Sequence, residues 1–351
     1  MGFRHIYILA VALLFGCEVH QFPEPKSFGM ILHLHYEPDF YVWEHYYDPA
    51  LGSISPVAPP TGAGVDEAHP GTSSVYDNQA THGIMRIVVR VYPKGNLDTY
   101  LREFIFYRDI TEGKGYDCDV NLDIGAGNYD IAVWSDIKED ANNSYFYNSD
   151  NFRRVFIVNE HYLGNTDFRD GYRGRVEVEL AHTQRVQEPE HREVTMRRPM
   201  GKYEFITTDL SEFLDRETTR RALSTRASAE DYRVVIAYPA FYPSSYSVIS
   251  NRLENAATGF SYETRMTVTG ENDASLGFDY VFINDIPDAG VLAEIGVYDM
   301  EGNQVAHSRQ ITVPLRRDHH TILRGAFLST NASGGVGIDP GFDGDHNVVV
   351  P

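Results

Sequence analysis

The sequence predicts an all-β protein built from antiparallel β-sandwich domains, and three observations support this prediction. Apolar residues alternate with polar ones in many short stretches, which is the period-2 pattern of strands with one buried face. Turn-forming residues are frequent, with 29 Gly and 17 Pro among 351 residues. The one convincing α-helix signal begins at Asp209, where a capping residue precedes apolar residues at helical spacing.

Length and composition favour two folded domains. A chain of 351 residues is about twice the usual domain size. A hydrophobic content of 42% and an aromatic content of 13% supply enough apolar side chains for sizeable cores. The formal net charge of −20 makes nucleic acid an unexpected partner, because phosphate binding depends on clustered Lys and Arg.

The first residues have the features of a lipoprotein signal peptide. A short basic start is followed by ten apolar residues, 6–15, about half the length needed to span a bilayer. The residues that follow resemble a bacterial lipobox, formed by Leu14, Phe15 and Gly16 before Cys17. This resemblance implies that residues 1–16 are removed and that Cys17 carries the acyl chains, including palmitate. Residues 17–27 would then be a lipidated tether, since several acyl chains give stable anchoring.

Residues 28–193 are expected to form an N-terminal β-sandwich domain. Alternation predicts strands at 29–37, 84–92, 101–107, 118–124, 129–134, 154–158 and 175–180. We expect 118–124 and 129–134 to pair as a hairpin, because Gly125 to Asn128 between them tolerate a tight reversal. Residues 48–83 are rich in Pro, Gly, Ser and Ala and are expected to form a long surface loop.

A C-terminal β-sandwich domain is expected at residues 194–330. Its predicted strands lie at 232–239, 262–269, 277–284, 291–298, 309–314 and 320–329. Asp209 and Glu212 are spaced for a capping box at the start of a short side helix. Leu210, Phe213 and Leu214 form the apolar face of that helix. Residues 331–351 form a Gly/Asp-rich C-terminal tail.

No sequence pattern indicates catalysis or a resident cofactor. The chain has no Gly-x-Ser-x-Gly elbow, no phosphate-binding glycine loop and no His-Glu-x-x-His motif. Asp339, Asp343 and Asp345 resemble a calcium loop, but the EF-hand spacing and the bidentate Glu are absent. An acidic solvated turn is therefore the expectation there. We expect a non-enzymatic protein with no cofactor and no metal.

Two further groups of residues are candidate binding sites. His33 and His35 share one face of a strand, with His45 nearby, and could build a zinc site. No carboxylate or thiolate ligand is evident in register with them, so exposed histidines are the expectation. The Tyr-rich stretches 41–47, 145–147 and 238–246 could stack on sugars, although core packing is the commoner role of such aromatics.

Six stretches, each occurring once, carry a resemblance to a known family. They are the lipobox at 14–17, Gly-Asn-Tyr-Asp-Ile-Ala-Val-Trp-Ser-Asp at 127–136, Tyr-Phe-Tyr-Asn-Ser-Asp at 145–150, Gly-Asn-Thr-Asp-Phe-Arg-Asp at 164–170, Arg-Pro-Met-Gly-Lys-Tyr-Glu-Phe at 198–205 and Gly-Ile-Asp-Pro-Gly-Phe-Asp-Gly-Asp at 337–345. Together they resemble the fimbrillin superfamily of Bacteroidales, the subunits and anchors of type V pili. The resemblance spans nearly the whole mature chain and is closest to a domain-of-unknown-function branch beside the fimbrial anchors. It implies two tandem transthyretin-like sandwiches of about seven strands each.

The resemblance also implies a function. It points to a lipid-anchored protein of the outer membrane, exposed at the cell surface, that acts in pilus anchoring or assembly and in adhesion. In polymerising members a protease removes the first strand after an Arg or Lys, and a strand of the next subunit fills the groove by β-augmentation. Here the candidate donor strand is short, and no motif marks Lys26, the candidate cleavage site. The donor residues are Asn347, Val348, Val349 and Val350.

These two departures favour an anchor, accessory or tip role over that of a main shaft subunit. The expected partners are other fimbrial subunits and the outer membrane. The alternative is a stand-alone surface lipoprotein that binds host or bacterial glycans through its aromatic clusters.

Overall fold

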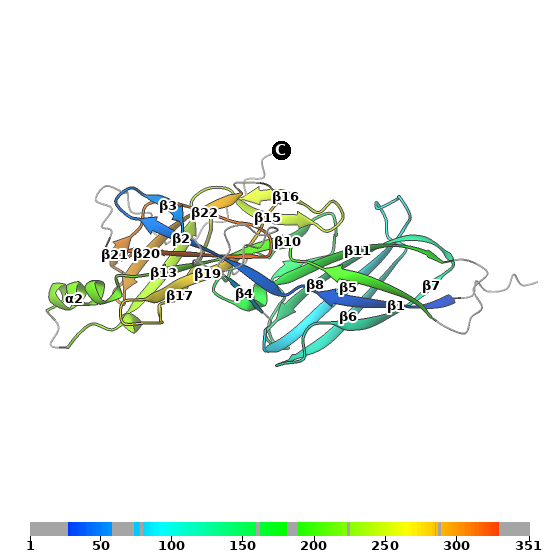
Figure 1. Cartoon of the computed structure of the whole chain (residues 1–351), viewed down its shortest axis with the longest axis horizontal. Coiled ribbons are helices and arrows are strands. Elements are labelled where there is room, and N and C mark those ends of the chain that lie inside the picture. The colour runs from blue at the N-terminus through cyan, green and yellow to red at the C-terminus, as the bar shows by residue number, and fades with distance from the viewer. Residues whose placement is uncertain are drawn as a thin grey trace, which may run out of the picture.

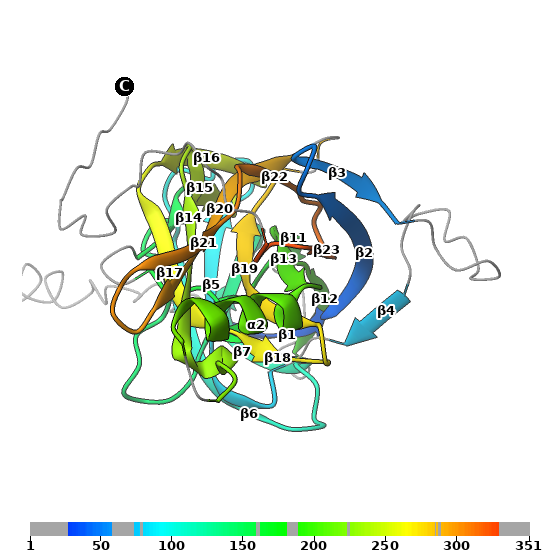
Figure 2. The same cartoon turned by 90° about the vertical axis from the view of Figure 1, so that its left-hand side faces the viewer.

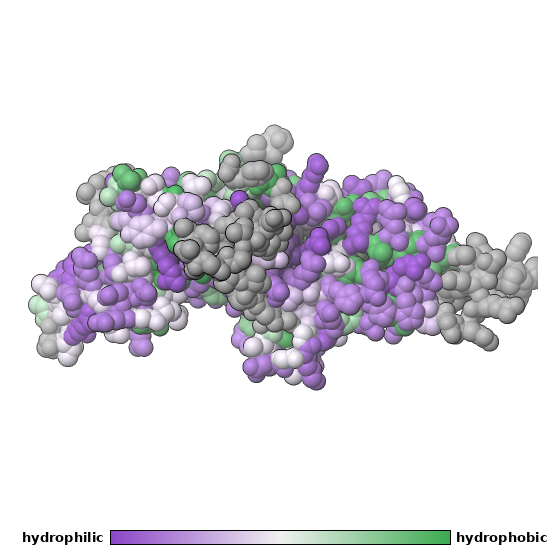
Figure 3. All heavy atoms as spheres, viewed as in Figure 1, coloured by the Kyte–Doolittle hydropathy of each residue, from purple (hydrophilic) through white to green (hydrophobic). Residues whose placement is uncertain are grey.

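The computed structural model describes residues 27–57, 74–77, 80–158, 162–180, 189–222, 225–284, 286 and 289–329. These residues form an elongated molecule of two lobes that lie end to end (Figure 1). Within them the secondary structure is almost entirely β, with one α-helix, so the predicted fold class is confirmed. The face seen in Figure 3 is mainly hydrophilic, with apolar atoms scattered over both lobes.

The first lobe is a sandwich of two sheets. Its three-stranded sheet has the order β12 (Glu190–Met196), β1 (Ser27–Tyr36) and β7 (Cys118–Gly125). Its four-stranded sheet has the order β11 (Gly171–Leu180), β8 (Gly127–Lys138), β5 (His82–Pro93) and β6 (Arg102–Thr111). Apolar side chains of both sheets, such as Leu32, Val89 and Ile131, meet in one buried core.

The second lobe contains the other three sheets. The largest has the order β18 (Thr267–Val268), β19 (Ala274–Phe282), β13 (Met200–Thr207), β23 (His319–Gly325), β2 (Asp39–Asp48) and β3 (Ser53–Pro56), with β4 (Ser74–Asp77) also paired to β2. The next has the order β17 (Phe260–Arg265), β14 (Tyr232–Tyr238), β20 (Gly290–Asp299) and β21 (Gln304–His307), with β22 (Ile311–Pro314) also on β20. A small sheet has the order β16 (Arg252–Ala257), β15 (Tyr242–Ser247), β10 (Val155–Ile157) and β9 (Tyr147–Asn148). Helix α2 (Leu210–Arg220) lies at the end of this lobe that is away from the first lobe (Figure 1), and it is therefore in front in the end-on view of Figure 2.

The predicted hairpin around Gly125 to Asn128 is wrong in its pairing, although both of its strands are present. β7 pairs with β1, whereas β8 pairs with β5 and β11. The turn therefore carries the chain from one sheet of the sandwich to the other. Alternation identifies the buried face of each strand but not its neighbour. Here the buried faces of β7 and β8 contribute to the same core, through residues such as Leu122 and Val133.

Several segments of the N-terminal half belong to sheets of the second lobe. β2 follows β1 after only residues 37–38, yet it pairs in parallel with β23. β3 and β4 pair with β2, so the predicted loop at 48–83 is wrong at these two short strands, which are too short to show a period. β10 pairs with β15. The division of the chain at residues 193 and 194 stays a prediction, and the chain crosses between the lobes more than once.

Helix α2 is present where it was predicted, and Leu210, Phe213 and Leu214 are buried. The predicted capping box is absent, because the side chain of Asp209 makes no cap hydrogen bond to the helix. Its carboxylate instead accepts hydrogen bonds from the hydroxyl of Thr207 and from the backbone N–H groups of Leu328 and Ser329. The Asp209 carboxylate, which the local sequence predicts to cap the helix, is thus bonded instead to a segment about 120 residues further along the chain.

Candidate functional site

The residues predicted from the signal sequence and the tail lie outside the described part of the chain. These are Leu14, Phe15, Gly16, Cys17, Lys26, Asp339, Asp343, Asp345, Asn347, Val348, Val349 and Val350. What the structure does bring together is the set of four internal motif stretches, 127–136, 145–150, 164–170 and 198–205. Side chains of 164–170 and 198–205, together with Asp279, form three ion pairs between the two lobes, which we call the junction network. The other two stretches contribute aromatic rings beside it.

The first ion pair of the junction network joins Arg198 to Asp170. Arg198 Nε donates to both carboxylate oxygens of Asp170, at 2.8 and 3.0 Å, and Nη2 donates to Oδ2 at 2.8 Å. Nη1 donates to the backbone oxygens of Glu37 and Asp39, at 3.3 and 3.2 Å. Arg198 and Asp170 are each 1% exposed. This guanidinium therefore holds the chain at the point where it passes from β1 to β2.

The second ion pair joins Arg169 to Asp279, with Arg169 Nη1 at 2.7 Å from Asp279 Oδ1. The other carboxylate oxygen accepts hydrogen bonds from the hydroxyls of Tyr162 and Tyr238, both at 2.5 Å. Burial raises the pKa of each tyrosine well above its usual value, so both hydroxyls keep their protons and donate. The Arg169 guanidinium also lies over the Tyr162 ring, 4.3 Å from its centroid. Both carboxylate oxygens of Asp279 thus have hydrogen-bond donors within the protein.

The third ion pair joins Lys202 to Asp167. Lys202 Nζ lies 2.8 Å from Asp167 Oδ1, and the hydroxyl of Tyr280 donates to the same oxygen at 2.6 Å. Burial, which raises the pKa of Asp167, is outweighed by the Lys202 charge and these hydrogen bonds, so this pKa is lowered. Within the four residues 167–170, three charged side chains therefore pair with residues of the C-terminal half.

Apolar rings fill the space beside the junction network. The Trp134 ring centroid lies 5.6 Å from that of Tyr147, which lies 5.2 Å from that of Phe282. The Tyr147 hydroxyl donates to the backbone oxygen of Arg169 at 2.7 Å. Both faces of β8 are consequently buried, one in the sandwich core and the other against the second lobe. Paired charges together with aromatic packing thus join the two lobes.

Asp318 adjoins the junction network and is expected to destabilise the protein at neutral pH. Burial raises its pKa to about 6, and Oδ1 has no hydrogen-bond partner among the described residues. Because this folded-state pKa lies above the unfolded value of about 3.9, the energetic cost is absent below about pH 4 and complete above about pH 6. The backbone of Asp318 has a positive φ of 55°, which Asn adopts as readily as Asp, so a change to Asn adds no backbone strain.

We therefore expect Asp318→Asn to raise the free energy of unfolding by about 1–3 kcal/mol at pH 8 and to leave it unchanged at pH 4. Urea unfolding at the two pH values measures this difference. The exposed Asp109, changed to Asn, is the matched control and should have little effect at either pH. Equal effects of Asp318→Asn at both pH values would show that its ionisation is not the cause.

The aromatic stretches contribute mainly to the cores. Tyr47, Tyr147, Tyr238, Tyr242 and Tyr246 are buried, at 0–3% exposed. From the same stretches Tyr46 and Phe241 are exposed, at 48% and 64%. Tyr46 lies on β2 and Phe241 in the connection between β14 and β15, so they are not neighbours on one sheet face and the glycan-binding alternative has little support.

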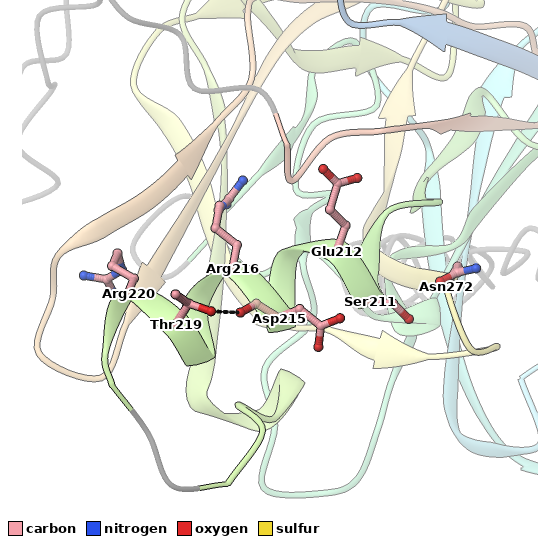
Figure 4. A pocket seen from close by; sticks show the side chains of 7 residues that line it. All are labelled: Ser211, Glu212, Asp215, Arg216, Thr219, Arg220 and Asn272. Carbon is pink, nitrogen blue, oxygen red and sulfur yellow. Dashed lines mark hydrogen bonds between the residues drawn. The ribbon is translucent and has the colours of Figure 1, made fainter.

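A hollow of about 850 Å³ lies along α2. It is lined by Ser211, Glu212, Asp215, Arg216, Thr219, Arg220 and Asn272. Figure 4 shows these side chains spread along the helix, with one hydrogen bond among them, from Thr219 Oγ1 to the backbone oxygen of Asp215. Their functional groups do not converge on one point, so this hollow has no catalytic arrangement.

The structure therefore defines a two-lobed, all-β protein whose lobes are held by a buried polar junction. The chain belongs to a family of unknown function (DUF6562), whose model matches residues 57–351. This match confirms the domain-of-unknown-function assignment made from the motifs. No helix of the described residues is long and apolar enough to cross a membrane. No curated protein matches the sequence.

Solved structures with a similar fold include three from Bacteroidales. The fimbrial anchor protein Mfa2 of Porphyromonas gingivalis is 13% identical, with a TM-score of 0.36 over 79% of this chain and 82% of that chain. A fimbrial assembly protein of Parabacteroides distasonis is 14% identical, with a TM-score of 0.37 over 85% and 90%. A candidate cell adhesion protein of Bacteroides eggerthii is 8% identical, with a TM-score of 0.42 over 86% and 88%.

Proposed function

We propose that this chain is a non-enzymatic, lipid-anchored, fimbrillin-like protein of the outer membrane surface. It acts in pilus anchoring or assembly, and thereby in adhesion, by strand exchange with a partner subunit. The observation that carries this proposal is the place of β1 in the fold. The N-terminal strand of the described chain is also the central strand of a sheet.

β1 fills a groove that a strand of another chain could also fill. It runs antiparallel to β7 and parallel to β12, so both of its edges are paired. Its inward side chains Met30, Leu32, Leu34 and Tyr36 are at most 7% exposed. Backbone hydrogen bonds along two edges and alternate side-chain pockets are the features by which β-augmentation holds a strand.

The position of basic residues supports an anchor role over a shaft role. The sequence has no Lys or Arg between Lys26 and Arg86. Cleavage at Lys26 would leave all ten residues of β1 in place, because this strand begins at Ser27. The next basic residue, Arg86, lies within β5 and donates to Asp136 at 2.9 and 2.6 Å. A protease specific for Arg and Lys therefore has no site that frees β1 alone.

A subunit that keeps β1 can donate a strand but has no open groove to accept one. The donor would be the segment Asn347 to Val350. One-sided exchange places a subunit at an end of an assembly, and lipid at Cys17 would make that end the membrane-proximal one. These two features together support the anchor role.

The donor role is tested in native cells with a chain that ends at His346. Sheared surface material is run on denaturing gels with and without boiling and probed for this chain. The complete chain should give heat-sensitive bands of high mass, and the truncated chain should give the monomer. The control is His346→Ala, which keeps the donor segment and should keep the high-mass bands. A monomer band from the complete chain would leave the glycan-binding lipoprotein as the better account.

Lipidation is a separate prediction, and it concerns Cys17. The chain has two cysteines, Cys17 and Cys118. Cys17→Ala is expected to abolish metabolic labelling with palmitate and to release the protein from membranes, because the only acylation site is lost. Cys118→Ala is the matched control and should leave labelling unchanged. Cys118 packs against the core of the first lobe, and burial raises the pKa of its thiol. Labelling that persists in Cys17→Ala would refute the lipobox assignment.

A further inference from the structure

Six titratable side chains gather on the outward face of the three-stranded sheet. They are His191 and Glu193 of β12, His33 and His35 of β1, Asp119 of β7 and Asp117 just before it. All but His191 line a surface hollow of about 390 Å³. The sequence shows the two histidines of β1 but not their neighbours, since β7 and β12 lie about 85 and 160 residues away along the chain. His45, the third histidine weighed for zinc, is buried in the other lobe at 4% exposed.

Each histidine of β1 bridges the two neighbouring strands. His33 Nδ1 lies 2.7 Å from Asp119 Oδ1, and its Nε2 lies 2.8 Å from His191 Nδ1. His35 repeats the pattern, with Nδ1 3.0 Å from Asp117 Oδ2 and Nε2 2.6 Å from Glu193 Oε2. The same order of groups, carboxylate then imidazole then a further ligand-type atom, thus occurs twice side by side.

The carboxylates of the β7 side orient the imidazoles. A neutral imidazole that donates its Nδ1 proton to a carboxylate presents a lone pair at Nε2. This is the arrangement in which proteins hold histidine ligands of metals, with the carboxylate in the outer shell. Asp119 therefore turns the lone pair of His33 toward β12, where His191 and Glu193 project from the same face.

We propose that this face binds one divalent transition-metal ion of the zinc class through His33 Nε2, His191 Nδ1 and the Glu193 carboxylate. Imidazole nitrogen and carboxylate oxygen are the ligands that such ions prefer. Glu193 lies directly opposite His33 in the strand register, so its carboxylate can turn from His35 to the ion. The inference does not depend on the pilus role.

The side chains need a small rearrangement to close around the ion. Two ligands with zinc bonds of about 2.0–2.1 Å lie about 3.3 Å apart in a tetrahedron. His33 Nε2 and His191 Nδ1, now 2.8 Å apart, would separate by about half an ångström. Among the described residues no three such groups already surround a common point. With His33 Nδ1–H bonded to Asp119, the proton between the two rings is on His191 Nδ1, and it moves through solvent to His191 Nε2 so that both facing nitrogens offer lone pairs to the ion. The ion then completes a site in which Asp119 already orients His33.

The test is titration of the purified full-length chain with Zn²⁺ by calorimetry, and with Co²⁺ by visible absorption. We expect one ion per chain with the intense absorption of four-coordinate Co²⁺. His191→Ala should abolish this binding, and Asp119→Asn should weaken it about 10–100-fold through the orientation of His33. His82→Ala, at an exposed histidine outside the cluster, should bind like the parent chain.

Zn²⁺ binding that is undetectable in the parent, or equal in the parent and in His191→Ala, refutes the site. Unchanged affinity in Asp119→Asn refutes the assigned ligand nitrogen of His33. All three substituted side chains are exposed, and circular dichroism of each variant establishes that the fold is kept.

Discussion

Arg198→Ala should lower the free energy of unfolding by about 3–5 kcal/mol. The substitution leaves the Asp170 carboxylate buried without its cation, and it also removes the donors to the backbone of Glu37 and Asp39. An uncompensated buried charge costs far more than the pair itself contributes. Urea unfolding followed by circular dichroism measures the change.

The adjacent residue provides the matched control. Arg197 pairs with Glu37, but their side chains are 65% and 49% exposed. Because such exposed pairs contribute between zero and about 1 kcal/mol, Arg197→Ala should change the stability little. Equal losses in the two variants would show that burial of the Arg198 pair has no particular energetic role. Hydrogen exchange should report the loss in Arg198→Ala first at the crossing from β1 to β2.

Asp279→Asn is expected to cost a comparable amount, about 3–5 kcal/mol. The amide nitrogen cannot accept the hydrogen bonds of Tyr162 and Tyr238, and Arg169 is left with its charge at 1% exposure. The shape of the side chain hardly changes, so the loss reports charge and hydrogen bonding. Thermal and urea unfolding of the purified chain measure it.

A second variant separates the ion pair from the packing around it. The double change Arg169→Met and Asp279→Leu removes both charges, and it should cost less than Asp279→Asn alone because no charge is left unpaired. The surface pair of Asp98 and Arg153, with side chains 80% and 52% exposed, provides the control Asp98→Asn, which should be nearly neutral. A double variant that is less stable than the single one would contradict this account.

The sequence predicted strands better than it predicted their partners. Alternation located β7 correctly, because one face of this strand lies in a core and side chains alternate between faces. β5 and β8 were also located correctly, although both of their faces are buried. Pairing depends on contacts between residues that are distant along the chain, such as β1 with β12. Nothing within 118–134 distinguishes a hairpin from a turn between two sheets.

Local sequence patterns could not predict the ion pairs of the junction network either. Apart from Asp279, the residues of its ion pairs were singled out only as parts of motifs. The spacings between partners range from 28 residues for Asp170 and Arg198 to 110 for Arg169 and Asp279. One signal was visible, since Asp279 interrupts an otherwise apolar run between Gly277 and Phe282. A carboxylate inside a buried strand requires a partner, but its identity is set by the tertiary fold.

The passage of β1 directly into β2 has a mechanical consequence. A pull on the chain at Ser27 acts along the axis of β1, so its ladders to β7 and β12 are loaded in shear and resist together. Any force that β1 transmits passes through residues 37–38, held by Arg198, into β2, which is paired with β23 in the second lobe. Tension at one end of the molecule is thereby distributed over both lobes before any single strand can peel away.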